Sequence, residues 1–188
     1  MTDAKLLHLA VVAYNEMVAI WRARNIPSDL LPGAMAVIAS GDKLYFASSL
    51  RTVPNSVRLR DVPQGSVREL MDEALTMGIG THSHGGGCSE INCLELFWAK
   101  NEKQDPPIGP PKPRVAIWVL PKHKQIDTNS ERNVRPCTWE SRADPGYGCQ
   151  EIALAYSLDP IDSTVAPDAA GDDWDFTLEK SIRPPCKQ

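Results

Sequence analysis

The sequence predicts an α/β protein, because segments with helical spacing of apolar residues are interspersed with short, continuous apolar runs. Helical spacing covers residues 4–24, 67–77, 88–100 and 149–158, and the strand-like runs are 34–39, 44–50 and 114–120. At 188 residues, one hydrophobic core can bury most of the apolar surface. We therefore expect a single domain over residues 1–188, with a core at about 34–158, an N-terminal helix at 4–24 and a C-terminal extension at 159–188.

The N-terminal part is predicted to place a β-hairpin between two helices. The first helix ends in a segment that contains Pro27 and Pro32. The apolar runs that follow are separated by Ser40-Gly41-Asp42-Lys43, in which the Gly-Asp pair suits a tight hairpin turn. The next helix ends at Gly78, because glycine readily adopts the left-handed conformation that stops a helix.

The C-terminal part is predicted to continue with a helix, a strand and a helix. The helix over 88–100 begins at a cysteine that follows a run of glycines. Residues 105–113 contain five prolines and form a stiff connector into 114–120, whose continuous apolar sequence is typical of a strand at the centre of a sheet. The last helix ends before Pro160, and a strand-like piece at 174–178 could pack on a sheet edge or cover the site.

The charge of the chain is concentrated at its C-terminal end. The net charge is −4 and the pI about 5.6, but residues 1–150 carry 17 Lys and Arg against 16 Asp and Glu, whereas residues 151–188 carry 3 against 8. The composition therefore argues against a strongly basic nucleic-acid-binding protein, and it neither excludes nor indicates a polyanionic substrate.

The cysteine count favours an intracellular protein with thiols free to bind metal. Five cysteines is an odd number, which suits a disulfide framework poorly. Residues 6–13 resemble the apolar part of a short signal peptide, but the helical pattern continues through Trp21 and favours a helix of the mature fold, so secretion stays a second possibility. We expect no membrane partner, because no stretch reaches membrane-spanning length.

The segment Gly85-Gly86-Gly87-Cys88-Ser89-Glu90 is the strongest functional signal in the chain. It places a thiol and a carboxylate in the first turn of a helix, where the positive end of the helix is expected to lower a thiol pKa. With Cys137 and Cys149, Cys88 would give a zinc ion three ligands and leave one tetrahedral position open for a water, as in catalytic zinc sites. Glu90 would then handle the proton of that water.

This pattern resembles the zinc-dependent cytidine deaminase superfamily, whose signature is His/Cys-x-Glu followed by Pro-Cys-x-x-Cys. Cys88 matches the first ligand, Glu90 the proton shuttle and Pro136-Cys137 the start of the second motif, with Cys149 as the third ligand. The chain departs from the signature because residues 138–148 separate the two later cysteines. With its glycine-led Cys-Ser-Glu and this split second motif, the chain looks more like the divergent group that includes bacterial polymorphic-toxin deaminases than like the housekeeping nucleoside enzymes. The resemblance implies a three-layer α/β/α sandwich with a mixed central sheet.

The resemblance also implies an activity, the zinc-dependent hydrolytic conversion of cytosine to uracil in single- or double-stranded DNA or RNA. A deaminase of free cytidine, deoxycytidine or a nucleotide is the first alternative. A catalytically silent zinc-binding module of the same fold, with four protein ligands including His84 or Cys93, is the second. The third is a thiol enzyme in which Cys88 is the nucleophile and His84 the base.

Further residues are candidates for the substrate site and for the metal. The candidate substrate contacts are His84, Ser49, Pro136, Trp139 and Tyr147, and the candidate phosphate contacts are Arg51, Arg58 and Arg60, for which a solvated surface is the simpler interpretation. Either His82 or His84 could replace Cys149 as a ligand. A disulfide between Cys137 and Cys149 is the alternative to metal binding, and Cys93 is expected to be a buried thiol.

Overall fold

The computed structural model describes residues 1–25, 27, 32–49, 66–82, 87–101, 111–119, 136–137, 146–169 and 177–180. Within these residues the protein has four helices and two β-sheets, one of five strands and one of two. The predicted α/β class is therefore confirmed. The described residues include no helix that is both long and apolar enough to cross a membrane.

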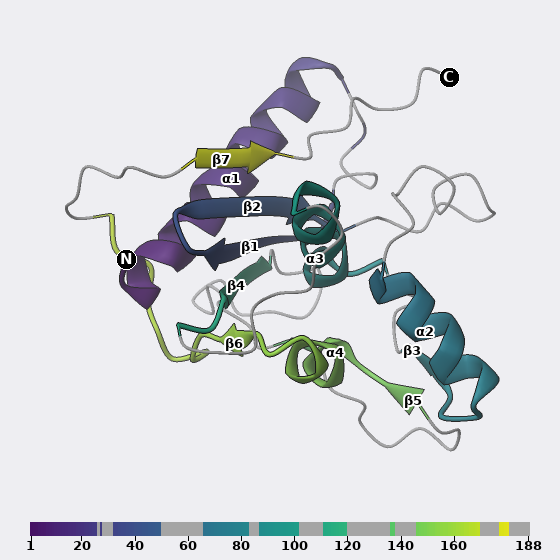
Figure 1. Cartoon of the computed structure of the whole chain (residues 1–188). Coiled ribbons are helices and arrows are strands. Elements are labelled where there is room, and N and C mark those ends of the chain that lie inside the picture. Colours follow the sequence, from purple (N-terminus) through teal and green to yellow (C-terminus); the bar gives the residue numbers. More distant parts are fainter. Residues whose placement is uncertain are drawn as a thin grey trace.

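The larger sheet has mixed strand directions and the order β6-β4-β1-β2-β7 (Figure 1). Its strands are β1 (Ala34–Ser40), β2 (Lys43–Ser48), β4 (Arg114–Val119), β6 (Asp159–Pro160) and β7 (Thr177–Lys180). The middle strand β1 is antiparallel to both β2 and β4, whereas β6 and β7 pair in parallel with β4 and β2. The predicted hairpin is β1–β2, and Gly41 in its turn has a φ of +59°, which glycine adopts without strain.

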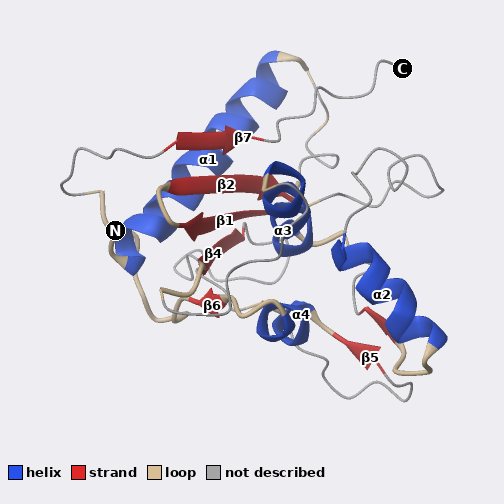
Figure 2. Ribbon diagram, in the orientation of Figure 1, coloured by secondary structure: helices blue, strands red, loops and turns tan. Residues whose placement is uncertain are grey.

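Helices cover both faces of this sheet (Figure 2). Helix α1 (Asp3–Ala23) packs on β1 and β4 from one face, and α3 (Ser89–Lys100) packs on β1 and β2 from the other. Helix α2 (Ser66–Thr76) lies against α3, and the short helix α4 (Cys149–Ala155) contacts β6. The layered α/β/α arrangement follows from the placement of α1 and α3 on opposite faces.

The core formed by the described residues consists of two apolar clusters, one on each side of the five-stranded sheet. Alternating residues of β1 explain the division: Val37 faces the α1 cluster and Ile38 faces the α3 cluster. The same alternation separates Phe46 from Tyr45 in β2. The sheet is therefore buried on both faces, as its nearly continuous apolar sequences predict.

The predicted helices and the strands at 34–39, 44–50 and 114–120 are all present, with ends that shift by a few residues. The last helix ends at Ala155 rather than near residue 158, because Ser157 adopts a left-handed conformation with a φ of +55°. The expected strand of the tail is β7, which begins at Thr177 and pairs at the edge of the sheet beside β2. The connector at 105–113 lies mostly outside the described residues.

Candidate metal centre

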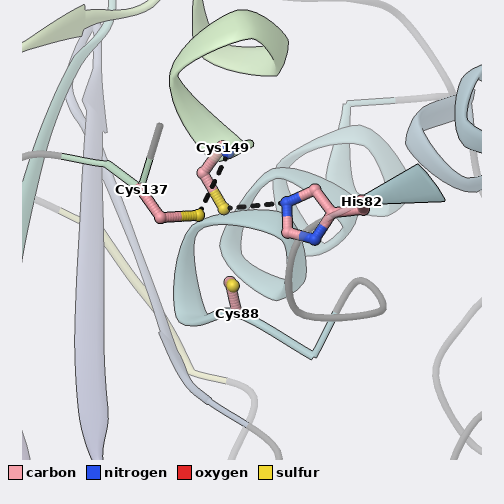
Figure 3. A group of neighbouring side chains, drawn as sticks. All are labelled: His82, Cys88, Cys137 and Cys149. Atoms are coloured by element: carbon pink, nitrogen blue, oxygen red, sulfur yellow. Dashed lines mark hydrogen bonds between the residues drawn. The ribbon is translucent and has the colours of Figure 1, made fainter. Parts of the chain in front are cut away.

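Four metal-ligating side chains from distant parts of the chain come together on the α3 side of the sheet. Figure 3 shows them pointing toward one another: His82, Cys88, Cys137 and Cys149. Their ligand atoms all lie within 4.8 Å of one another. A tetrahedral zinc site with Zn–S bonds of about 2.3 Å has ligand atoms about 3.8 Å apart, so the group needs only a small contraction to hold an ion. One nitrogen and three sulfur donors suit zinc.

Two helix starts and main-chain hydrogen bonds position the three thiols. Cys88 is the N-cap residue of α3, with an extended backbone at φ −69° and ψ 150°. Cys149 is the first residue of α4, and the backbone N–H of Cys149 donates to Cys137 Sγ at 3.3 Å. The Cys137 carbonyl accepts from the Gln150 N–H at 3.0 Å, so the Cys137 main chain is attached to the start of α4. These contacts bring the two later cysteines together across the interval between them.

His82 is positioned by the small sheet. Strand β3 (Thr81–His82) pairs in parallel with β5 (Gly146–Tyr147), with His82 opposite Tyr147. The buried His82 ring lies edge-on to the Tyr147 ring at a centroid distance of 5.7 Å, and its Nε2 is 3.3 Å from Cys149 Sγ. The Tyr147 hydroxyl donates to the Met71 carbonyl in α2 at 3.3 Å. The small sheet therefore connects His82 to the residue pair that precedes Cys149.

Glu90 lies in the first turn of α3, beside the thiols. The Ser89 hydroxyl donates to Glu90 Oε2 at 2.9 Å. Glu90, Pro136 and Cys149 line a small cavity whose other walls are apolar and include Val115 and Leu158. Burial raises the pKa of the Glu90 carboxyl, and the hydrogen bond from Ser89 only partly offsets this effect. The arrangement gives the site a carboxyl group that can hold and release a proton.

Two of the thiols, Cys88 and Cys149, have pKa values that favour their protonated form when no metal is bound. Hydrogen bonding to Cys137, together with burial and the nearby Glu90 charge, raises the pKa of Cys88 despite an opposing contribution from Cys149. Hydrogen bonding to Cys137 and Cys88, followed by burial, raises the pKa of Cys149. The sequence-based expectation that the helix start lowers the Cys88 pKa was therefore wrong for the metal-free arrangement. A metal ion would displace these protons, because thiolates are the ligating form.

The structure brings together the three cysteines predicted as ligands, with Glu90 and Pro136 beside them. It adds His82 to the group instead of exchanging it for Cys149. The four described cysteines are free, so the alternative disulfide between Cys137 and Cys149 is wrong. Cys93 is fully buried away from this group, and its thiol donates to the Tyr45 carbonyl at 3.0 Å, which confirms the expected buried thiol.

The other candidate substrate contacts have varied surroundings. Ser49 accepts hydrogen bonds from the N–H groups of Gly33 and Ala34, both at 3.1 Å, and so fixes the start of β1. Tyr147 anchors the small sheet through its contacts with His82 and Met71. The remaining candidates lie outside the described residues: His84, Trp139, Arg51, Arg58 and Arg60.

Sequence reasoning missed His82 as an addition to the three cysteines. The missing information was the pairing of β3 with β5, two strands of two residues each that lie more than sixty positions apart. The sequence signal that could have indicated this role was the His-x-His pair of His82 and His84.

Comparison of the chain with protein-family models, with curated proteins and with solved structures gave no match.

Proposed function

We propose that this protein is a zinc-dependent hydrolytic deaminase that converts cytosine to uracil. One observation carries the proposal: Cys88, Cys137 and Cys149 converge around one point although the chain separates them widely, and Glu90 lies beside them. The signature of the cytidine deaminase superfamily requires such a convergence, with the carboxylate near the metal and not bound to it. The two-layer helical covering of a mixed sheet is also in keeping with that resemblance.

The residues of the site suit the chemistry. Zinc would supply the positive charge that makes water a usable nucleophile near neutral pH. Glu90 would accept a proton from that water at its carboxylate, deliver it to the ring nitrogen of the base, and assist the departure of ammonia. The neighbouring apolar walls at Val115, Leu158 and Ile152 limit water around Glu90, which keeps its proton available for transfer.

The substrate part of the proposal rests on the resemblance to toxin-type deaminases. It favours cytosine within single- or double-stranded DNA or RNA over a free nucleoside or nucleotide. Purified protein incubated with cytidine, deoxycytidylate, both forms of DNA and RNA would distinguish these substrates by the uracil formed. Uracil in the free nucleosides alone would overturn the polynucleotide preference.

Glu90→Gln tests the mechanism, because the amide keeps the size of the side chain and cannot accept the proton. We expect normal zinc content and a loss of turnover of about 10²-fold or more. Glu95→Gln is the matched control, since Glu95 is a buried glutamate on the same helix, outside the metal group. Turnover by Glu90→Gln equal to that of Glu95→Gln would show that Glu90 has no part in the reaction.

A structural zinc module is the second candidate, and the position of His82 favours it. Four protein ligands close a tetrahedral site and leave no position for a water. Such a protein would hold about one zinc per chain and lose its folded structure on chelation. It would form no uracil from any of the substrates above.

A further inference from the structure

His82 and Glu90 indicate two different kinds of metal centre, His82 a closed one with four protein ligands and Glu90 an open one. His82 Nε2 lies with the three sulfur atoms as a fourth potential ligand, which would complete a closed site. Glu90 places a carboxyl group in a cavity beside Cys149. Glu90 is not one of the four grouped side chains, so it contributes nothing to holding the ion in a closed centre. His82 and Glu90 can both serve the same metal centre if the centre has two states, a closed state with His82 bound and an open state with His82 displaced.

The support of His82 differs from that of the thiols. Cys88 caps the twelve-residue helix α3, which packs on β1 and β2, and Cys149 begins α4 with Cys137 hydrogen-bonded to the same turn. His82 is carried by β3, a strand of two residues whose sheet partner β5 also has two. Its ring makes an edge-on contact with Tyr147, and its Nε2 lies 3.3 Å from Cys149 Sγ. Displacement of the imidazole therefore acts on a two-stranded sheet that is separate from the five-stranded sheet and that also contacts α2.

We propose that His82 is an exchangeable fourth ligand. In the resting protein His82 binds the metal and closes the centre. When His82 dissociates from the metal, the coordination position beside Glu90 becomes open. The resting centre is then one imidazole and three thiolates, and the open centre is the three thiolates with a vacant position. The proposal refines the proposed function by adding control of access to the same site. Its metal-coordination part stands whether or not the protein deaminates cytosine.

Four proteins test the resting state through X-ray absorption at the zinc edge: wild type, His82→Ala, His82→Gln and, as the matched control, His8→Ala. His8 belongs to α1, on the other face of the sheet. The expected result is three sulfur neighbours and one imidazole in wild type and His8→Ala, and loss of the imidazole signal in both His82 variants. A wild-type spectrum without imidazole, or an imidazole that persists in the His82 variants, overturns the proposal.

Exchange is tested by substituting cobalt(II) and titrating with 2-mercaptoethanol, whose thiolate adds a sulfur-to-cobalt absorption when it enters a vacant position. His82→Cys serves as a permanently closed centre with four protein thiolates. We expect a response at the lowest thiol concentration in His82→Ala, at a higher concentration in wild type, and none in His82→Cys. A wild type as unresponsive as His82→Cys would show that His82 is a permanent ligand.

Turnover provides a separate measurement. If the protein deaminates cytosine, zinc-loaded His82→Cys should lose at least tenfold in rate while it stays folded. Wild-type rates in His82→Cys would contradict the need for displacement. Absence of uracil with every protein would reject the deaminase proposal, whereas the cobalt titration would still decide whether His82 exchanges.

Discussion

Zinc should raise the melting temperature by a predictable amount, because the described residues include one group of four potential ligands. They come from β3, the N-cap of α3, the segment at Cys137 and α4. The unfolded chain lacks this arrangement, so zinc binds the folded state selectively. Above the dissociation constant, each tenfold rise in free zinc then adds about 1.4 kcal/mol to the free energy of unfolding.

The corresponding temperature shift follows from the size of the chain. An unfolding entropy of about 2.1 cal/mol/K per residue gives about 0.4 kcal/mol/K for the 188 residues. One zinc ion should therefore shift the melting temperature by about 3.5 °C per tenfold change in free zinc. Two ions would double this slope, so the measurement also counts the sites.

The assay is thermal unfolding followed by circular dichroism in metal buffers that fix free zinc over several powers of ten. Cys149→Ala should shift the onset of the slope to higher zinc, because it removes a ligand. Cys93→Ala is the matched control: it loses a buried thiol and its hydrogen bond to Tyr45, which lowers the melting temperature at every zinc concentration, but its slope should equal that of wild type. A melting temperature that is independent of zinc in wild type would refute the assignment of the metal centre.

Two further predictions concern protons and hydrogen bonds. Thiols in the unfolded chain ionise near pH 8.5. In the folded protein, burial raises the pKa of Cys93, and hydrogen bonding and burial raise the pKa of Cys149. Above pH 8.5, the free energy of unfolding of the metal-free protein should therefore fall by up to about 1.4 kcal/mol per pH unit for each of these thiols. Urea unfolding with chelator across this range measures the loss, and a stability that rises with pH would contradict it. Ser49→Ala should lower the free energy of unfolding by about 1 to 3 kcal/mol, because two backbone N–H groups lose their acceptor, and an unchanged urea midpoint would show that water replaces the hydroxyl.

The main elements of the fold could be predicted from the sequence because their signals are local. Apolar spacing in α1 and α3 and the continuous apolar runs of β1, β2 and β4 reflect burial that each segment shows by itself. Gly41 and Gly78 marked the hairpin turn and the end of α2, and both have the positive φ that this role requires. The convergence of the cysteines was predicted through the family signature, which periodicity alone does not provide.

The remainder depends on contacts between distant segments. Strands β3, β5 and β6 have two residues each, too few for a periodic pattern, and they exist only because a partner lies beside them. The pairing of β3 with β5 places His82 beside the three cysteines. The sequence could therefore suggest His82 as a ligand, but it could not show that His82 is present in addition to Cys149. The raised thiol pKa values arise in the same way, from three thiols meeting in a buried place.

Strand β7, which belongs to the C-terminal extension, covers the β2 edge of the five-stranded sheet. It pairs with β2 over Lys43 to Phe46 and so occupies main-chain groups that would otherwise be exposed along an apolar strand. An uncovered edge of this kind is a template for pairing with another molecule. A protein shortened before residue 177 would therefore keep the metal ligands and most of the core, and its characteristic defect would be self-association through β2.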